Sequence, residues 1–124
     1  MAEQKDIVSL DDIKLLVNSF YDAAKQDDLL GPVFNEKVKD WDRHLNIMYS
    51  FWETVILDQY SYKGTPFNQH KDLPINSDHF NRWVNLFSSI VDAHFAGPHA
   101  DDAKKKAKQF GTVFWNKMEF LRNT

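Results

Sequence analysis

The chain has 124 residues, a length that fits one domain with a single core. Its 15 Lys and Arg residues against 18 Asp and Glu residues give a net charge of −3, so it lacks the basic excess typical of nucleic-acid-binding proteins. The absence of cysteine excludes disulfides, thiolate nucleophiles and thiolate-ligated metal centres. Histidine, carboxylate and tyrosine side chains remain as plausible metal ligands.

The N-terminal residues, the apolar runs and the composition limit the possible compartments and architectures. The N-terminus carries acidic residues where a signal peptide needs a basic stretch and then an apolar one, and no apolar run approaches the roughly 20 residues that span a bilayer. We therefore expect a cytoplasmic protein with neither a membrane nor a nucleic acid as partner. Phe, Trp and Tyr supply 15% of the chain, whereas Gly and Pro number four each. Few helix breakers and many flat side chains favour helices around something bulky.

The first helical pattern begins at Ser9, a capping residue followed three positions later by Asp12, as in a capping box. We expect this helix to break between Leu29 and Phe34, because Gly31 and Pro32 favour a short connection. Its apolar residues recur at three- and four-residue steps, the spacing of one helical face, which points Tyr21 inward. They are Ile13, Val17, Phe20, Tyr21 and Ala24.

A second helical pattern runs from about Trp41 to Leu57, with His44 on or beside its apolar stripe. The stretch from Asp58 to Gln69 contains Tyr, Gly and Pro residues that are typical of irregular backbone. His70 lies at the end of that stretch, just before Leu73 and Pro74. The stripe of the second helix comprises Trp41, Leu45, Met48, Trp52, Val55 and Ile56.

Two more helices complete the pattern. The third begins near Asn76 or Ser77 and continues to about Phe95, and the last runs from about Asp101 to Leu121. The residues expected to face inward on the third helix are Phe80, Trp83, Val84, Phe87, Ile90, Val91 and His94. Those on the last are Ala103, Ala107, Phe110, Phe114 and Met118, with Gly111 as a weak point. Without any alternating strand pattern, the fold class is all-α.

The common enzyme signatures are missing from the sequence. It contains no G-x-S-x-G elbow, no phosphate-binding G-x-x-x-x-G-K, no dinucleotide-binding G-x-G-x-x-G and no H-E-x-x-H pair. The acidic pairs at 11–12 and 101–102 stand at predicted helix starts, where carboxylates favour the positive end of the helix dipole. Helix capping therefore explains them better than catalysis.

Each of the five histidines has a structural explanation to weigh against a functional one. His79 and His99 are most simply solvated surface groups, and His94 reads as a hydrogen-bonded histidine at the edge of the core. His44 and His70 are individually more often structural as well. Together with Tyr21 and Trp83, however, they can converge on one apolar cavity with several polar tips, which suits a flat apolar cofactor.

Several motifs along the chain resemble the group III truncated haemoglobins when they are taken in order. The match covers about residues 9 to 120, and the Gly-Gly pairs of the other truncated groups are absent, as is general in group III. The motifs are Phe20-Tyr21, Trp41-Asp42-Arg43-His44, Phe51-Trp52, the run from Tyr62 to His70, Leu73-Pro74-Ile75, and the run from His79 to Phe87.

The resemblance implies a shortened globin domain over residues 9–124, preceded by an N-terminal extension over residues 1–8. Two crossed helix pairs would form a two-over-two sandwich around haem b. His70 would be the proximal ligand of the iron, while Tyr21, His44 and Trp83 would stabilise the bound ligand on the distal side. The resemblance places Met48, Phe51, Trp52 and Phe67 in the pocket wall, and Arg82 is a candidate partner of the haem propionates.

The implied function is binding of dioxygen, and also of carbon monoxide, nitric oxide or cyanide, at five-coordinate ferrous iron. Dioxygen bound to iron is a better hydrogen-bond acceptor than bound carbon monoxide. Donors in the pocket should therefore slow the escape of dioxygen more than that of carbon monoxide. The alternative is a redox enzyme for nitric oxide dioxygenation or peroxide chemistry. Because the chain has no flavin or nicotinamide fingerprint, that enzyme would need an external reductase. A cofactor-free helical interaction module is the third hypothesis, and we expect a monomer.

Overall fold

The structure, a computed structural model, describes residues 4–57 and 76–122, and the side chains of residues 118–122 are outside that description. Within these ranges the chain forms helices and no strands, which confirms the all-α class. The helices are α1 (Leu10–Gln26), α2 (Gly31–Lys37), α3 (Trp41–Leu57), α5 (Ser77–His94) and α6 (Pro98–Arg122).

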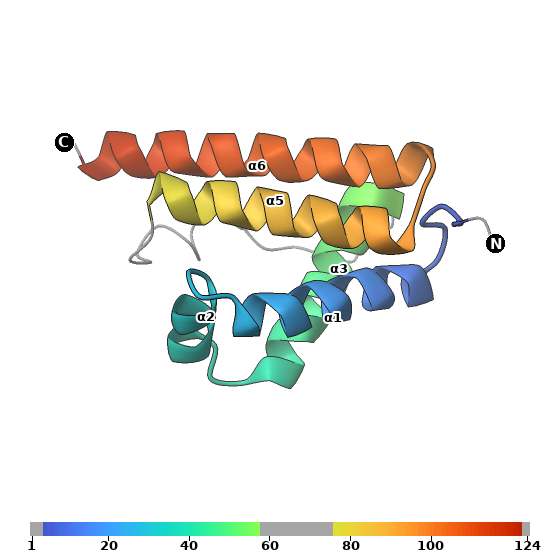
Figure 1. The fold of residues 1–124 in the computed structure, drawn as a ribbon, viewed down its shortest axis with the longest axis horizontal. Coiled ribbons are helices and arrows are strands. Elements are labelled where there is room, and N and C mark those ends of the chain that lie inside the picture. The colour runs from blue at the N-terminus through green and yellow to red at the C-terminus, as the bar shows by residue number, and fades with distance from the viewer. Residues whose placement is uncertain (1–3, 58–75, 123–124) are drawn as a thin grey trace.

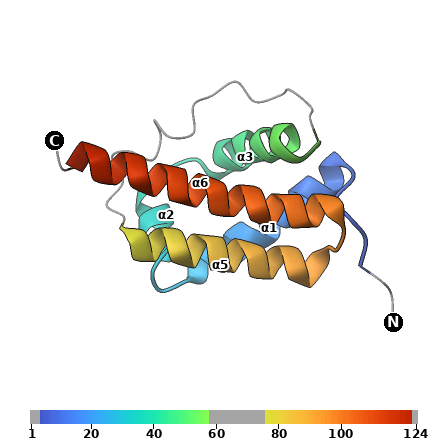
Figure 2. The ribbon, with the colours of Figure 1, turned by 90° about the horizontal axis from the view of Figure 1, so that it is seen from above.

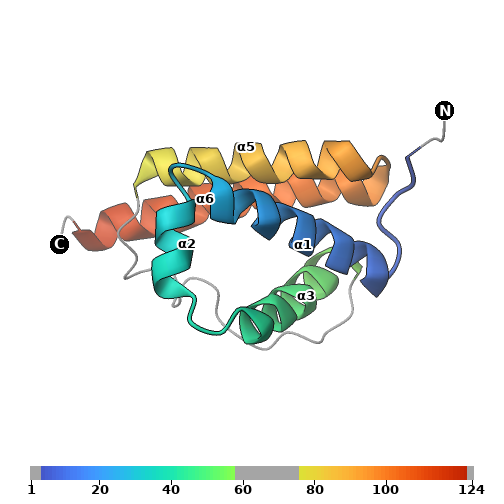
Figure 3. The same cartoon turned by 60° about the horizontal axis from the view of Figure 1, so that its bottom comes forward.

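The helices pack as two pairs, α5 with α6 and α1 with α3. Helices α5 and α6 run antiparallel and side by side (Figure 1), and the view from above shows the same pairing (Figure 2). Helix α1 packs against both α5 and α3, and α3 packs in turn against α6. This arrangement is the predicted two-over-two sandwich, with α2 added where α1 turns toward α3 (Figure 3).

Helix α1 begins where the sequence predicts. The Ser9 hydroxyl accepts a hydrogen bond from the backbone N–H of Asp12 at 3.3 Å. The Asp12 carboxylate accepts from the backbone N–H of Val8 at 3.0 Å, one residue before the N–H that a capping box would use. The inward face is confirmed, since its five predicted members and Leu16 are all buried.

Helix α2 corrects the prediction of a short connection, because Gly31 and Pro32 begin a helix there instead of only ending one. Proline suits a first helical turn, where no backbone N–H is needed. Asp27 shapes the preceding turn by accepting from the backbone N–H groups of Leu29 and Leu30. A Cβ atom on Gly31 would lie 2.6 Å from the carbonyl oxygen of Lys25, so only glycine fits this close approach to α1.

The predicted start of the last helix, about Asp101, is also wrong, because a Gly-Pro pair again begins a helix instead of only ending one. Helix α6 begins at Pro98, because proline again occupies the first turn. Gly97 makes the sharp turn from α5 with a φ of 140°, a value that glycine adopts without strain. The predicted start of α5 is confirmed, since Asn76 caps Ser77–His94.

The N-terminal segment, defined here as residues 4–9, packs on the turn between α5 and α6. The Asp6 carboxylate accepts from the backbone N–H groups of His99 at 2.9 Å and Ala100 at 2.8 Å, which caps the start of α6. The His99 Nδ1 lies 2.6 Å from the carbonyl oxygen of Ile7, so the prediction of a merely solvated His99 is wrong. Ile7 itself is fully buried in the core.

The core lies between α1, α3, α5 and α6. Two small residues of α6, Ala103 and Ala107, are fully buried and let α5 approach closely. Phe87 and Val91 of α5 fill the space between them and α1. None of the helices that the structure describes is long and apolar enough to cross a membrane.

Candidate functional site

A cavity of about 250 Å³ opens between the helices, and each of the described helices contributes side chains to its wall. Most of these side chains are aromatic or aliphatic, as expected for a site that binds a small organic molecule. The described part of the wall contains no carboxylate. Its polar members are Tyr21, Lys37, His44, His79 and the indole of Trp83.

Tyr21 is on the buried face of α1 with 6% of its surface exposed. Its hydroxyl oxygen lies 3.0 Å from the Nε2 atom of His44, so the two predicted distal residues form a hydrogen bond. Burial raises the pKa of the Tyr21 phenol, because the charged form would lose its hydration. The phenol therefore keeps its hydrogen at neutral pH and can act as a donor.

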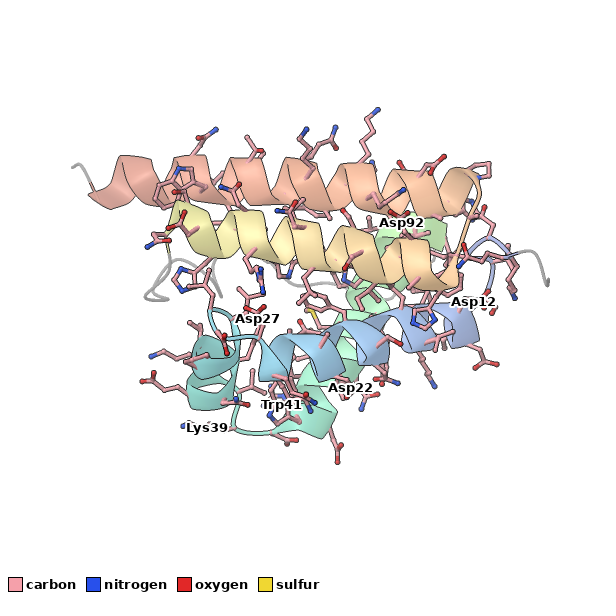
Figure 4. All side chains as sticks on the ribbon, viewed as in Figure 1. Asp12, Asp22, Asp27, Lys39, Trp41 and Asp92 are labelled. Atoms are coloured by element: carbon pink, nitrogen blue, oxygen red, sulfur yellow. The ribbon has the colours of Figure 1, made fainter. Side chains whose placement is uncertain are left out.

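His44 reaches Tyr21 from the first turn of α3. Its ring packs edge-on against the rings of Tyr21, at 5.1 Å, and Trp41, at 5.7 Å between centroids. Trp41 lies between α1 and the start of α3 (Figure 4). When Nε2–H of His44 donates to the phenol oxygen, the phenol hydrogen is free for a third group in the cavity. The pair can thus present a directed donor to a ligand.

An aromatic stack joins α5 to α3 across the cavity wall. Trp83 stacks on Phe87 at 5.6 Å between ring centroids, and Phe87 stacks on Trp52 at 4.7 Å. Phe20 of α1 meets Trp83 edge-on. These contacts hold the indole of Trp83 in the wall of the same cavity as Tyr21 and His44, so the structure brings these three residues together.

The remaining predicted site residues have different outcomes. Met48, Phe51 and Trp52 line the cavity from α3. Met48 and Trp52 belong to the predicted inward stripe, whereas the place of Phe51 was implied by the resemblance alone. His70 and Phe67 lie outside the described residues, so their roles stay predictions. Among the residues that are described, no group of three His, Cys, Asp or Glu could hold a metal ion.

Arg82 has a protein partner in the structure. Its Nη2 and Nε atoms both lie 2.7 Å from Oδ1 of Asp27, an ion pair that joins the α1–α2 turn to α5. Burial alone would raise the pKa of Asp27, but the Leu30 N–H and the Arg82 guanidinium outweigh it and hold that pKa below its ordinary value. The proposed pairing of Arg82 with a propionate stays a prediction.

Sequence reasoning missed two polar residues of the cavity wall, Lys37 and His79. His79 is four positions before Trp83, so helical spacing puts both on one face of α5, and this signal was present in the sequence. Lys37 belongs to α2, a helix that the sequence analysis did not predict. Its place in the wall had no comparable signal.

The lining fits a flat, mostly apolar group with a polar edge. Aromatic rings form much of the wall, and donors are grouped at particular points of it. Among the described side chains no buried polar atom lacks a hydrogen-bond partner. A ligand therefore does not need polar groups over its whole surface to fit this cavity. Iron porphyrins combine these properties, because their ring is apolar and their carboxylates sit on one edge.

Comparisons with known proteins agree with this architecture. No protein-family model matches the chain. A curated group 3 truncated hemoglobin of Campylobacter jejuni is 25% identical over 116 residues, which covers 90% of this chain and 91% of that protein. The crystal structure of a group III truncated hemoglobin from Campylobacter jejuni superposes with a TM-score of 0.85 at 24% identity, covering 94% and 95% of the two chains. The resemblance is thus confirmed over most of the chain, and the fold is that of a truncated globin.

Proposed function

We propose that this chain, a truncated globin by its fold, binds haem b in the cavity and uses it to bind dioxygen and other diatomic molecules. The observation that carries the proposal is the hydrogen bond of 3.0 Å between Tyr21 and His44. It lies inside an aromatic cavity, where the pair can present a directed donor to a ligand. The similarity to group III truncated haemoglobins supports the same conclusion.

Bound haem would supply an iron atom that binds diatomic ligands. We assign the imidazole that would hold this iron to His70, as the resemblance implies. Met48, Phe51 and Trp52 would contact the porphyrin plane and keep water away from it. Exclusion of water strengthens every hydrogen bond made inside the cavity.

The distal residues would act on the ligand as donors. The Tyr21 hydroxyl and the Trp83 indole N–H both belong to the cavity wall, and both can donate a hydrogen bond to a ligand. His44 positions the phenol by holding its oxygen. Polarised ligands such as dioxygen would be retained longest, because they accept hydrogen bonds most strongly.

Titration of the purified chain with hemin tests this proposal. We expect a Soret band at one haem per chain and, after reduction, a five-coordinate ferrous spectrum that changes with carbon monoxide. His70→Ala should abolish this spectrum. His94→Ala is the matched control, because His94 is a half-buried histidine outside the described cavity wall. A colourless wild-type protein, or an unchanged spectrum in His70→Ala, would contradict the proposal.

The same material tests the redox alternative. Rapid mixing of the oxygenated protein with nitric oxide, followed by candidate reductases, reports whether oxidation and re-reduction form a cycle. A cycle that stays slow with every reductase favours binding without turnover. Fast, sustained turnover would favour the enzyme.

A further inference from the structure

The polar side chains of the cavity wall fall into three sets. Tyr21 and His44 bond to each other, and Trp83 lies among aromatic rings. Lys37 and His79 belong to neither set. No carboxylate lines the described part of the cavity, so the cationic ammonium of Lys37 has no anion beside it there.

Lys37 and His79 come from elements that meet at one end of the cavity. Val33 of α2 packs against Phe80 of α5. Lys37 follows Val33 by one helical turn, and His79 directly precedes Phe80. The Asp27–Arg82 ion pair joins the turn before α2 to the same part of α5. The ribbon views place α2 at the same end of the molecule as the start of α5 (Figures 1 to 3), and Figure 1 shows it below that start.

The contacts of His79 determine which ring nitrogen faces a ligand. Its Nδ1 atom lies 3.2 Å from the backbone nitrogen of Asn76 and 3.1 Å from the Asn76 side-chain oxygen. Nδ1 can accept from the Asn76 N–H or donate to the Asn76 side-chain oxygen, according to the tautomer. When it accepts, the neutral ring carries its proton on Nε2, and a protonated ring carries one there as well. In both of these states Nε2–H is the donor that remains for the cavity.

Lys37 supplies a full positive charge, but its side chain is held only weakly in the structure. Its side chain is 44% exposed, and its ammonium lies 3.9 Å from the carboxylate of Glu36, its neighbour in the chain. Contacts at that distance between exposed groups contribute little. The ammonium can therefore reorient toward an anion in the cavity without giving up a strong interaction.

We propose that Lys37 and His79 bind the carboxylates of the haem, an inference that rests on the haem-binding function proposed above. Carboxylates leaving water need hydrogen-bonded or cationic partners, and an ammonium and an imidazole N–H supply charge-assisted bonds. Arg82, which the sequence suggested as the propionate partner, already forms an ion pair with Asp27. The propionate edge would accordingly face the rim between α2 and the start of α5.

Two variants with matched controls test the assignment by the rate of haem loss to excess apomyoglobin. His79→Glu keeps an acceptor for the helix cap, since Glu is typical of this capping position, and replaces the donor by a negative charge. It should speed haem loss about tenfold or more. Lys37→Gln should speed it about two- to fivefold. Lys39→Gln and His94→Gln, both outside the described cavity wall, should leave the rate unchanged.

Haem dimethyl ester separates carboxylate binding from a structural effect. With this ester the differences between wild type and the two variants should disappear, because no carboxylate remains. Differences that persist with the ester, or rates equal to wild type with ordinary haem, would overturn the inference while the haem-binding function stands. A wild-type chain that takes up no haem would overturn the proposed function and the inference with it.

Discussion

The two ends of the helical sandwich are packed in different ways. Where the N-terminal segment meets the α5–α6 turn, Ile7, Phe95 and Ala100 are at most 3% exposed. At the cavity end, the inward residues Leu45 and Met48 of α3 are only half-buried. One end has a dry, filled core, whereas the other keeps apolar side chains around an open space. Stability and ligand binding are thus assigned to different parts of a small domain.

Helix α3 contains both kinds of packing along one stripe. Ile56, in its last turn, is 4% exposed and packed in the core, whereas Met48 and Trp52 line the cavity. Helical periodicity predicts which side of α3 points inward, but it does not distinguish packing against side chains from facing a cavity. That distinction depends on the direction of neighbouring helices.

The largest effect is expected where the two ends join, at Phe87. This residue is 1% exposed and contacts the rings of Phe20, Trp52 and Trp83. Phe87→Ala should lower the free energy of unfolding by about 3–5 kcal/mol, because it removes buried surface and leaves a void. Urea unfolding of the haem-free and haem-loaded protein measures the loss.

Val113→Ala is the control for Phe87, because Val113 is 46% exposed and its truncation should cost less than about 0.5 kcal/mol. Haem affinity should fall in Phe87→Ala as well, since the stack that holds Trp83 is lost. A stability loss below about 1 kcal/mol would contradict the view of Phe87 as the joint between the two ends.

A smaller effect, confined to the filled end, is expected at Asp6. Its carboxylate uses both oxygens to cap α6, and Asn offers only one acceptor. Asp6→Asn should therefore lower the free energy of unfolding by about 1–2 kcal/mol without changing haem affinity. Asp22→Asn, at an exposed position in the second half of α1 (Figure 4), is the matched control. A changed haem affinity would show that the two ends are coupled.

The pH dependence of stability sharpens the Asp6 prediction. Burial acts to raise the pKa of Asp6, but the N–H groups of His99, Ala100 and Ile7 together outweigh it and hold that pKa below 3.8. The stabilisation is complete above the unfolded value of 3.8 and is lost as the pH falls through the lower folded value. Acid unfolding curves should therefore show a shallower loss of stability in Asp6→Asn than in wild type.

The sequence predicted those features of the fold that depend on local signals, and it failed where the packing of neighbouring helices decides. The start of α1 and the bounds of α3 and α5 were confirmed because caps and periodic apolar faces are local signals. Both errors arose at Gly-Pro pairs, at Gly31-Pro32 and Gly97-Pro98, where the residues that end one helix also begin the next. Local sequence favours a break in either case, and the close approach of neighbouring helices decides how soon the next helix begins.

The candidate site was predicted only in part for a related reason. Tyr21 and Trp83 stand out because they are polar-tipped residues on inward faces. His79 shares the face of Trp83 but also caps α5, and its capping position suggested a surface role. Lys37 depends on how α2 is oriented in the fold, which no pattern within the helix specifies.

The smallest effect on stability, and the one most specific to the cavity end, is expected at Tyr21. Tyr21→Phe removes a single hydrogen bond, to His44, so it should cost at most about 1 kcal/mol in stability. In the haem-loaded protein, oxygen dissociation should become about fivefold faster, which is the same free energy expressed as a rate. Carbon monoxide dissociation should change less, because that ligand accepts hydrogen bonds weakly. Tyr49→Phe is the control, since its hydroxyl bonds to Asn18 outside the described cavity wall. Stopped-flow dissociation rates that are equal in the two variants would remove Tyr21 from the ligand site and leave it as a core residue like those at the other end.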